Sequence, residues 1–252
     1  MYERAGCRAP ELRTLGAVPA IDVRDLVVRY GDLVAVDGLS FAAEAGSVTV
    51  LLGPNGAGKT STIEVLEGYR HPAAGTVRVA GLDPVKQHRQ MVSRIGVMLQ
   101  RGGVHPNLRA GEAAELFAAL YGGRHQATEL LTLVGLTERA RSTWRQLSGG
   151  EQQRLSLALA IAGDPEVAFL DEPTASVDPA GRVVVRAVVR RLAEQGACVL
   201  LTTHELDEAE RLADRVIIID RGRLVAEGTP AQLRDAGGVA EIRFGAPAGL
   251  DV

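Results

Sequence analysis

Cysteine is scarce in this sequence, because Cys7 and Cys198 are the only two among 252 residues. Two isolated cysteines form no metal-ligand pattern, and no disulfide or metal staple is needed. Hydrophobic residues make up 46% of the chain and charged residues 23%, which is typical of a soluble globular protein with a sizeable core. The cysteine usage fits a reducing cytosol, and Cys198 in the apolar run 197–201 is expected to be a core residue.

Long hydrophobic runs and a large excess of one charge are also missing. No apolar run approaches the roughly 18 residues that span a bilayer, and the longest candidates have the length of core strands. Residues 1–10 lack the apolar region of a signal peptide. The net charge is −3 and no dense Lys/Arg block occurs, which argues against nucleic acid as the main partner. We therefore expect any membrane contact to come only through a partner protein.

Short apolar runs alternate with helix-like segments along most of the chain. Strand-like runs are found at 21–30, 33–43, 47–52, 76–80, 95–99, 167–170, 198–201 and 216–219. Helices are expected at 59–67, 108–121, 127–134, 152–161, 180–194 and 205–212. This alternation predicts an α/β fold with a mostly parallel sheet covered on both faces. Residues from about 108 to 163 are rich in Ala, Leu and Glu, which indicates a helical insert.

A glycine-rich run stands between a strand and a helix and reads Gly53-Pro54-Asn55-Gly56-Ala57-Gly58-Lys59-Thr60. Its glycines let successive N–H groups face one anion, and the helix N-terminus adds partial positive charge. We expect this run to bind the phosphates of ATP, with Lys59 bridging the β- and γ-phosphates. Thr60 is placed to ligate Mg²⁺, and Ser61 is placed to donate to phosphate oxygens. A coincidental glycine-rich turn would not explain the lysine, the hydroxyl and both flanking elements.

Polar side chains follow other apolar strands at their carboxyl ends, where α/β sheets bind ligands. Asp171 and Glu172 follow 167–170, so Asp171 is expected to serve Mg²⁺ and Glu172 to orient and polarise the attacking water. His204 and Gln100 end two further strands, and the Gln100 amide can meet Mg²⁺ or the water. Taken alone, a strand capped by solvated acids, a structural histidine and a polar strand end remain alternatives.

A second glycine-rich run lies upstream of the acidic strand and reads Leu147-Ser148-Gly149-Gly150-Glu151-Gln152. It stands at the start of a helix, where free N–H groups, a hydroxyl and a positive dipole end form a second anion site. Glu151 is in capping-box position relative to Ser148. The cap and the anion site are compatible readings of the same residues.

Both runs in this order, with Leu-Ser-Gly-Gly-Glu-Gln-Gln-Arg at 147–154, resemble the ATP-binding cassette (ABC) ATPases over about residues 21–235. Glu67-Gly68-Tyr69, the segment 203–210 and Gly228-Thr229-Pro230 look most like bacterial multidrug exporter subunits of the daunorubicin-resistance kind. The resemblance implies a P-loop NTPase with a mixed, mostly parallel sheet, an N-terminal antiparallel β subdomain and a helical insert. The expected divisions are a flexible extension, an ATPase domain, its inserted helical subdomain and a tail, at 1–20, 21–235, about 101–163 and 236–252.

The resemblance also assigns roles to residues. It implies that Tyr30 stacks on adenine and that His204 contacts the γ-phosphate. Gln100 would report that phosphate to the insert, and Asp178 would lie at a dimer interface. The run 148–151 would close over a phosphate held by the other subunit. The family more often has Gly-Leu or Ala-Leu where this chain has Ser176-Val177, a departure that leaves Asp178 in place.

The expected function is that of an ATP-hydrolysing subunit of an ABC exporter for a drug or other small hydrophobic compound. It would act through a separate membrane permease that docks near 100–108, at the cytoplasmic face of the cell membrane. Two chains, either identical or a pair of related cassettes, would sandwich two ATP molecules head to tail. The alternative is a non-transport ABC ATPase acting on DNA or ribosomes. A small-molecule kinase would leave the 147–152 run and His204 unexplained.

Overall fold

The computed structural model describes residues 18–99 and 103–236. Expectations for Cys7, for Gln100, for residues 1–17 and for the tail from 237 onward therefore lie outside the described residues.

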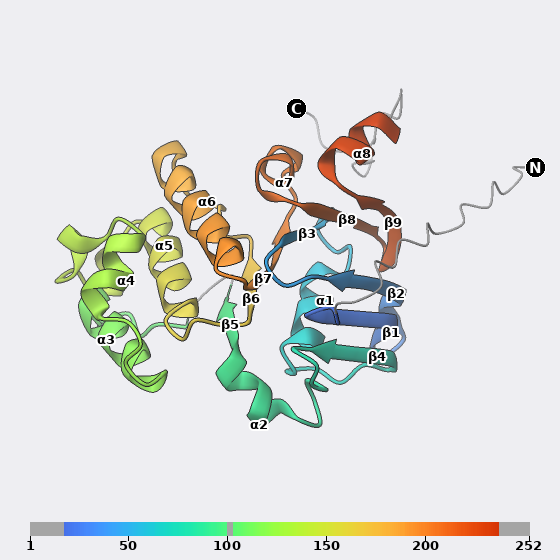
Figure 1. Cartoon of the computed structure of the whole chain (residues 1–252), viewed down its shortest axis with the longest axis horizontal. Helices are drawn as coiled ribbons and strands as arrows, with labels where there is room; N and C mark the ends of the chain where they lie inside the picture. The colour runs from blue at the N-terminus through green and yellow to red at the C-terminus, as the bar shows by residue number, and fades with distance from the viewer. Residues whose placement is uncertain (1–17, 100–102, 237–252) are drawn as a thin grey trace, which may run out of the picture.

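A six-stranded sheet connects the helical side of the molecule with a smaller sheet (Figure 1). Its strands are β3 Val48–Leu52, β5 Ile95–Met98, β6 Val167–Asp171, β7 Cys198–Thr203, β8 Arg215–Asp220 and β9 Arg223–Gly228. They lie in the order β5-β6-β7-β3-β8-β9, and all neighbours are parallel except β8 and β9, which are antiparallel. The carboxyl ends of β5, β6, β7 and β3 therefore meet at one edge of the sheet.

A three-stranded antiparallel sheet has the order β2-β1-β4. Its strands are β1 Ile21–Tyr30, β2 Leu33–Ala43 and β4 Ala74–Val79. The first two form a hairpin around Gly31 and Asp32, where Gly31 has a φ of +60°. This arrangement confirms the expected antiparallel β region near the N-terminus.

The helices are α1 Lys59–Leu66, α2 His88–Met91, α3 Ala110–Leu120, α4 Ala127–Leu133, α5 Gly149–Ala160, α6 Pro179–Glu194, α7 Leu206–Leu212 and α8 Pro230–Ala236. Short 3₁₀ turns occur at Val92–Arg94, Thr137–Arg139 and Trp144–Gln146. Figure 1 shows α3, α4 and α5 gathered on the side of the molecule opposite β1, β2 and β4. No helix in the ranges 18–99 and 103–236 is long and apolar enough to cross a membrane.

The central parallel strands of the six-stranded sheet are buried on both faces, as the alternation within β7 shows. Val199 and Leu201 belong to one hydrophobic cluster, which includes residues of α3 to α7. Cys198 and Leu200 belong to the other, which includes residues of α1, β1 and β2. Burial on both faces explains why the parallel strands are continuous apolar runs rather than alternating ones. Cys198 is a core residue as expected, and burial raises the pKa of its thiol to about 12.

The expected α/β fold with a mostly parallel sheet is confirmed. Strand β9 and helix α8 were not expected from the sequence. Strand β9 lies at the edge of the sheet, and two of its residues, Leu224 and Val225, are exposed. A half-exposed edge strand lacks the continuous apolar run that marks a buried strand in the sequence. The domain boundaries at 21–235 and at about 101–163 remain predictions.

Candidate functional site

Four neighbouring strands deliver most of the predicted site residues to one edge of the sheet. Strand β3 leads into the loop before α1, β6 ends in Asp171 and is followed by Glu172, and β7 is followed by His204. The fourth strand, β5, leads towards Gln100, which lies outside the described residues. The parallel pairing of β3, β7 and β6 thus brings together residues more than a hundred positions apart in the chain.

The glycine-rich loop is shaped by close contacts with neighbouring backbone. Gly58 has a φ of +103°, and a Cβ there would lie 2.6 Å from the carbonyl oxygen of Ala35. A side chain is therefore excluded at Gly58, the residue directly before α1. The Lys59 ammonium is buried and donates to the carbonyl oxygens of Gly53 at 2.7 Å and Pro54 at 3.1 Å. Burial lowers the pKa of Lys59, and the nearby carboxylates of Glu172 and Asp171 oppose this shift.

The other predicted members of this loop and of the first turn of α1 differ in exposure. Ala57 is buried, whereas the exposed members are Asn55, Gly56 and Thr60. The Ser61 hydroxyl lies 3.1 Å from the hydroxyl of Tyr30. Thr60 in the first turn of α1 is therefore exposed at the edge where the predicted phosphate would lie.

Tyr30 ends β1 beside α1, with 41% of its surface exposed. Its hydroxyl lies 3.1 Å from that of Ser61 and donates to Glu64 at 3.2 Å. The guanidinium of Arg70 lies 4.1 Å from the ring centroid and donates to Glu64 at 2.8 Å. One ring face is thus covered by a cation, and stacking of adenine on Tyr30 remains a prediction.

Asp171 and Glu172 share one threonine. The Thr202 hydroxyl donates to the carboxylate of Asp171 and accepts from the backbone N–H of Glu172 at 3.0 Å. Burial raises the pKa of Asp171, against the opposing effects of the Thr202 hydrogen bond and of Lys59. A cation bound beside Asp171 would oppose this rise in pKa, because a nearby positive charge favours the ionised carboxylate.

Glu172 and His204 form a polar pair at this edge. His204 Nδ1 lies 2.9 Å from Glu172 Oε1. Glu172 has a φ of +48°, a conformation that non-glycine residues rarely adopt and that turns its side chain away from the line of β6. Gln153 of α5 donates to the backbone carbonyl of Glu172 at 2.9 Å. The turn that carries Glu172 is therefore held from both β7 and α5.

The second glycine-rich run begins α5 and is closed by a reciprocal cap. Glu151 N–H donates to the Ser148 hydroxyl at 3.2 Å, and Ser148 N–H donates to the Glu151 carboxylate at 2.8 Å. Arg139 also pairs with Glu151, at 2.9 Å. The Glu151 carboxylate thus points to groups of its own chain. Within the described residues, no hydrogen bond or ion pair joins the 148–151 run to the 53–61 loop.

The predicted interface residue Asp178 caps α6, because its carboxylate accepts from the Gly181 N–H at 2.7 Å. The preceding loop lies against the start of α5, since a Cβ on Gly150 would come 3.2 Å from the Ser176 carbonyl oxygen. Ser176 has a φ of +59°. The run 148–150 and the loop before α6 are therefore neighbours in this chain.

The site contains functional candidates that sequence reasoning missed. Thr202 and Gln153 act through contacts with distant residues, and a threonine at the end of an apolar strand gives no local signal. Glu67 is another, because it is only 5% exposed, and its burial and the nearby Asp171 raise its pKa to about 8. The fourth missed residue is Arg182 of α6, which contacts both the loop before α6 and Glu205 at the start of α7. The sequence signal that could have indicated a buried Glu67 is its position directly after the apolar residues that end α1.

Comparisons with known proteins agree with this arrangement. The family described as ABC transporter matches residues 36–175. The chain is 43% identical to the daunorubicin resistance ATP-binding protein DrrA3 of Streptomyces coeruleorubidus, over 85% of this chain and 70% of that protein. It is 40% identical to the Nod factor export ATP-binding protein I of Burkholderia orbicola, over 86% of this chain and 73% of that protein.

Solved structures give the same result for the fold. An ATP-binding subunit of an ABC transporter superposes with a TM-score of 0.78 at 26% identity, covering 86% of this chain and 92% of that one. A dimeric ATP-binding cassette in a post-hydrolysis state, bound to ADP and Pi, superposes with a TM-score of 0.74 at 24% identity, covering 83% of this chain and 98% of that one.

Proposed function

The chain belongs to the ABC transporter family, and from this premise we propose that it energises an exporter through a separate membrane permease. Membership confirms the expected P-loop cassette fold and the expected class of enzyme, an ATPase. The relatives named for daunorubicin resistance and Nod factor export support an export role and do not favour the DNA or ribosome alternative. The cargo we propose is a drug or another small hydrophobic compound.

The observation that carries the catalytic part is the convergence of Lys59, Asp171, Glu172 and His204 at one sheet edge. Lys59 uses two of its three N–H donors on loop carbonyls, so one remains for a phosphate oxygen. Backbone N–H groups of the loop and the first turn of α1 contribute further donors. This edge therefore binds the phosphates of ATP, with the adenine towards Tyr30.

The donor set at this edge also fits Mg²⁺. The hydroxyl of the exposed residue Thr60 and the Asp171 carboxylate are hard oxygen ligands, and Mg²⁺ in nucleotide sites keeps few protein ligands besides phosphates and water. When bound, Mg²⁺ supplies charge neutralisation at the phosphates, and Gln100 completes the proposed ligand set.

Glu172 is the residue we propose to orient and polarise the attacking water. Its carboxylate leaves β6 beside the loop that holds Lys59, and its backbone is fixed by Thr202 and Gln153. His204 Nδ1 lies 2.9 Å from this carboxylate and supports one orientation of it, and we propose that the imidazole contacts the γ-phosphate. Such general-base assistance contributes about 10²–10⁴-fold to hydrolysis.

The start of α5 supplies the second half of each ATP site, from the partner chain. In the reciprocal cap the Ser148 hydroxyl accepts a hydrogen bond, so its own proton remains free for a phosphate oxygen. Gly149 and Gly150 leave the helix end open, and the loop up to Asp178 lies beside it. We propose that two chains close head to tail, as a homodimer or with a related cassette, so that 148–151 of one covers ATP held by the other.

The proposed place of work is the cytoplasmic face of the cell membrane, with membrane contact only through the permease and with no nucleic acid partner. The permease is proposed to dock on the side near 100–108 that carries α3 and α5. Co-purification of a polytopic partner, followed by transport into inverted vesicles, measures this directly. An ATPase that copurifies with no membrane protein and follows DNA or ribosomes would contradict it.

ATP-dependent dimerisation tests the sandwich. Glu172→Gln keeps the shape of the site but removes the base, so ATP should convert it to a stable dimer by light scattering. Ser148→Arg should bind ATP as a monomer nearly as well as the unchanged chain, yet neither close nor hydrolyse. A Glu172→Gln protein that binds ATP but stays monomeric at high concentration would contradict the sandwich. Loss of monomer ATP binding in Ser148→Arg would place Ser148 in an ordinary one-chain pocket.

A further inference from the structure

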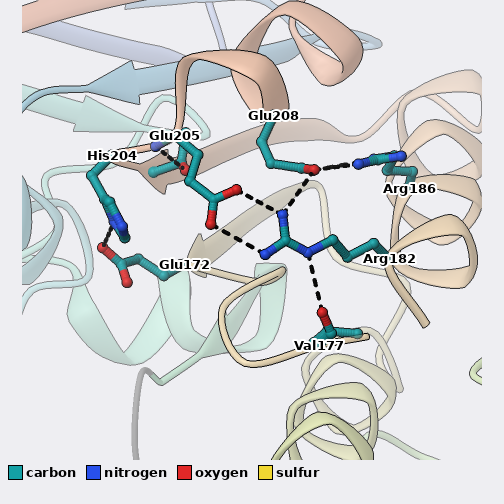
Figure 2. A network of polar contacts seen from close by, with 8 residues as sticks. Glu172, Val177, Arg182, Arg186, His204, Glu205 and Glu208 are labelled. Carbon is teal, nitrogen blue, oxygen red and sulfur yellow. Dashed lines mark hydrogen bonds and ion pairs between the residues drawn. The ribbon is translucent and has the colours of Figure 1, made fainter. Parts of the chain in front are cut away.

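An ion-pair network joins α6 to the loop that carries His204 (Figure 2). Its centre is Arg182, whose two terminal nitrogens donate to Glu205 at 2.6 and 3.2 Å, one to each carboxylate oxygen. One of them also lies 3.4 Å from Glu208, which is 2% exposed and pairs with Arg186. The pairing with Glu205 is bidentate, the geometry that fixes an arginine most firmly.

The third nitrogen of the same guanidinium reaches a different loop. Arg182 Nε donates to the backbone carbonyl of Val177 at 3.1 Å. Val177 is followed by Asp178, which caps α6, and it is preceded by Ser176, which lies against Gly150 of α5. Arg182 therefore holds the loop that touches the start of α5.

The other end of the network leads to the proposed catalytic pair. Glu205 directly follows His204, and its N–H donates to the Thr203 hydroxyl at 3.0 Å. His204 in turn lies 2.9 Å from Glu172. Figure 2 shows this chain of contacts running from Val177 through Arg182 and Glu205 to the turn that presents His204.

We propose that Arg182 is a positioning residue for ATP hydrolysis, which fixes the position of His204 relative to the 175–178 loop. One guanidinium clamps both loops, so a movement of the loop beside the start of α5 is passed to the turn that carries His204. The proposal rests on the proposed roles of Glu172 and His204. Lysine cannot replace the clamp, because a single ammonium lacks the planar fork that reaches Val177 and both oxygens of Glu205.

A purely structural role makes a different prediction. Arg182 and Glu205 keep 27% and 35% of their side-chain surface exposed, and such partly exposed pairs contribute little to stability. A structural pair would therefore change stability slightly and leave turnover unchanged. A positioning residue would lower kcat without weakening ATP binding.

Arg182→Lys in the full chain tests the proposal, with Arg190→Lys as the matched control. Arg190 lies on the same helix and pairs with Asp214 at 2.8 Å, away from both loops. We expect Arg182→Lys to lower kcat about 10- to 100-fold, as misplacement of a catalytic group does, with KM for ATP within about twofold. Arg190→Lys should leave both unchanged, and thermal unfolding should confirm that both variants fold. An Arg182→Lys protein that matches Arg190→Lys would overturn the proposal.

A double-mutant cycle with His204→Ala tests whether Arg182 acts through His204. Single-turnover rates keep slow variants measurable. If Arg182 positions His204, adding Arg182→Lys to His204→Ala should change the rate less than about twofold. The same fold loss in both backgrounds would overturn the coupling and leave the proposed function intact. A His204→Ala protein with an unchanged rate would instead overturn the proposed role of His204, and the clamp with it.

Discussion

Two helices in this molecule begin at glycine-rich runs, and their first turns are built differently. At the start of α1, Gly58 offers no side-chain cap, and Lys59 places a buried ammonium beside the glycine-rich loop. At α5, Ser148 and Glu151 cap each other, and Arg139 covers the same carboxylate. No side chain caps the backbone N–H groups at the start of α1, so they remain available to a ligand. At the start of α5, the Ser148 side chain already accepts from one backbone N–H group.

This difference indicates separate roles for the starts of α1 and α5. The start of α1 lies at the sheet edge with Asp171, Glu172 and His204, so it has the chemistry of a complete phosphate site. Among the residues that the structure describes, the start of α5 has no counterpart of the Glu172–His204 pair, and the Ser148 hydroxyl keeps one proton for a ligand. We therefore expect loss of Lys59 to weaken ATP binding already in a single chain, and changes at the start of α5 to act only when two chains close.

The largest effect is expected at Glu172. Glu172→Gln should lower kcat by about 10²–10⁴-fold, because the water loses its base. ATP affinity of the monomer, measured by equilibrium titration at a protein concentration too low for dimerisation, should change less than twofold, which separates chemistry from binding at this edge. Glu166→Gln, an exposed partner of Arg94, is the control and should retain full activity. Equal loss of ATP affinity in Glu172→Gln would mean that the carboxylate serves binding rather than chemistry.

The next largest effect is expected at Lys59. Lys59→Ala should weaken ATP binding by about 10- to 100-fold, the value of charge-assisted hydrogen bonds to a phosphate. The same titration on Lys86→Ala, which removes an exposed lysine paired with Asp83, should show no change. If Ser148→Ala weakened monomer binding as much as Lys59→Ala does, the distinction between the two helix starts would fail.

The far end of α1 gives a pH-dependent effect of intermediate size. Burial raises the pKa of Glu67 to about 8, above its ordinary value of 4.5. The folded protein therefore binds more protons than the unfolded chain between these values, and its stability falls as pH rises through that window. Glu67→Gln should flatten this fall and raise the free energy of unfolding near pH 8 by on the order of 2 kcal/mol.

Urea unfolding between pH 5 and pH 8.5 measures this effect of Glu67→Gln. Glu115→Gln, a change at an exposed position of α3, serves as the control. A pH profile of Glu67→Gln that coincides with that of the unchanged protein would show that Glu67 is ionised in the folded state.

The smallest effect is expected on stability at Ser148. Ser148→Ala removes the cap of α5 and should lower the free energy of unfolding by about 1 kcal/mol, whereas Ser148→Thr keeps a hydroxyl and should lose little. Hydrolysis at saturating protein concentration should fall in Ser148→Ala beyond what the loss of stability explains. An unchanged hydrolysis rate would reduce Ser148 to a helix cap.

Local sequence was enough to predict the elements that carry the site. The strand, glycine-rich loop and helix around Lys59 are coded by adjacent residues, and so is the cap formed by Ser148 and Glu151. Contacts between distant segments were not predictable in the same way. The hydroxyl of Thr202 between Asp171 and Glu172, and the clamp of Arg182 on Val177 and Glu205, depend on which strands and helices become neighbours.

Burial was the other quantity that the sequence left open. In the sequence, Glu67 is a polar residue at the end of a predicted helix. Its burial in the folded chain, which desolvates the carboxyl, appears only in the structure. The exposed edge strand β9 was missed for the opposite reason, because half-exposed strands lack the continuous apolar runs that mark β6 and β7.

Complementation between two defective chains tests the central claim most directly. A Ser148→Arg chain keeps its Lys59 loop, and a Lys59→Ala chain keeps its α5 start. Each should be inactive alone, but the mixture should regain ATP hydrolysis, because one composite site is intact. A chain carrying both changes, mixed with Ser148→Arg, should remain inactive. Full hydrolysis by Ser148→Arg alone, or no recovery in the mixture, would contradict a site shared between two chains.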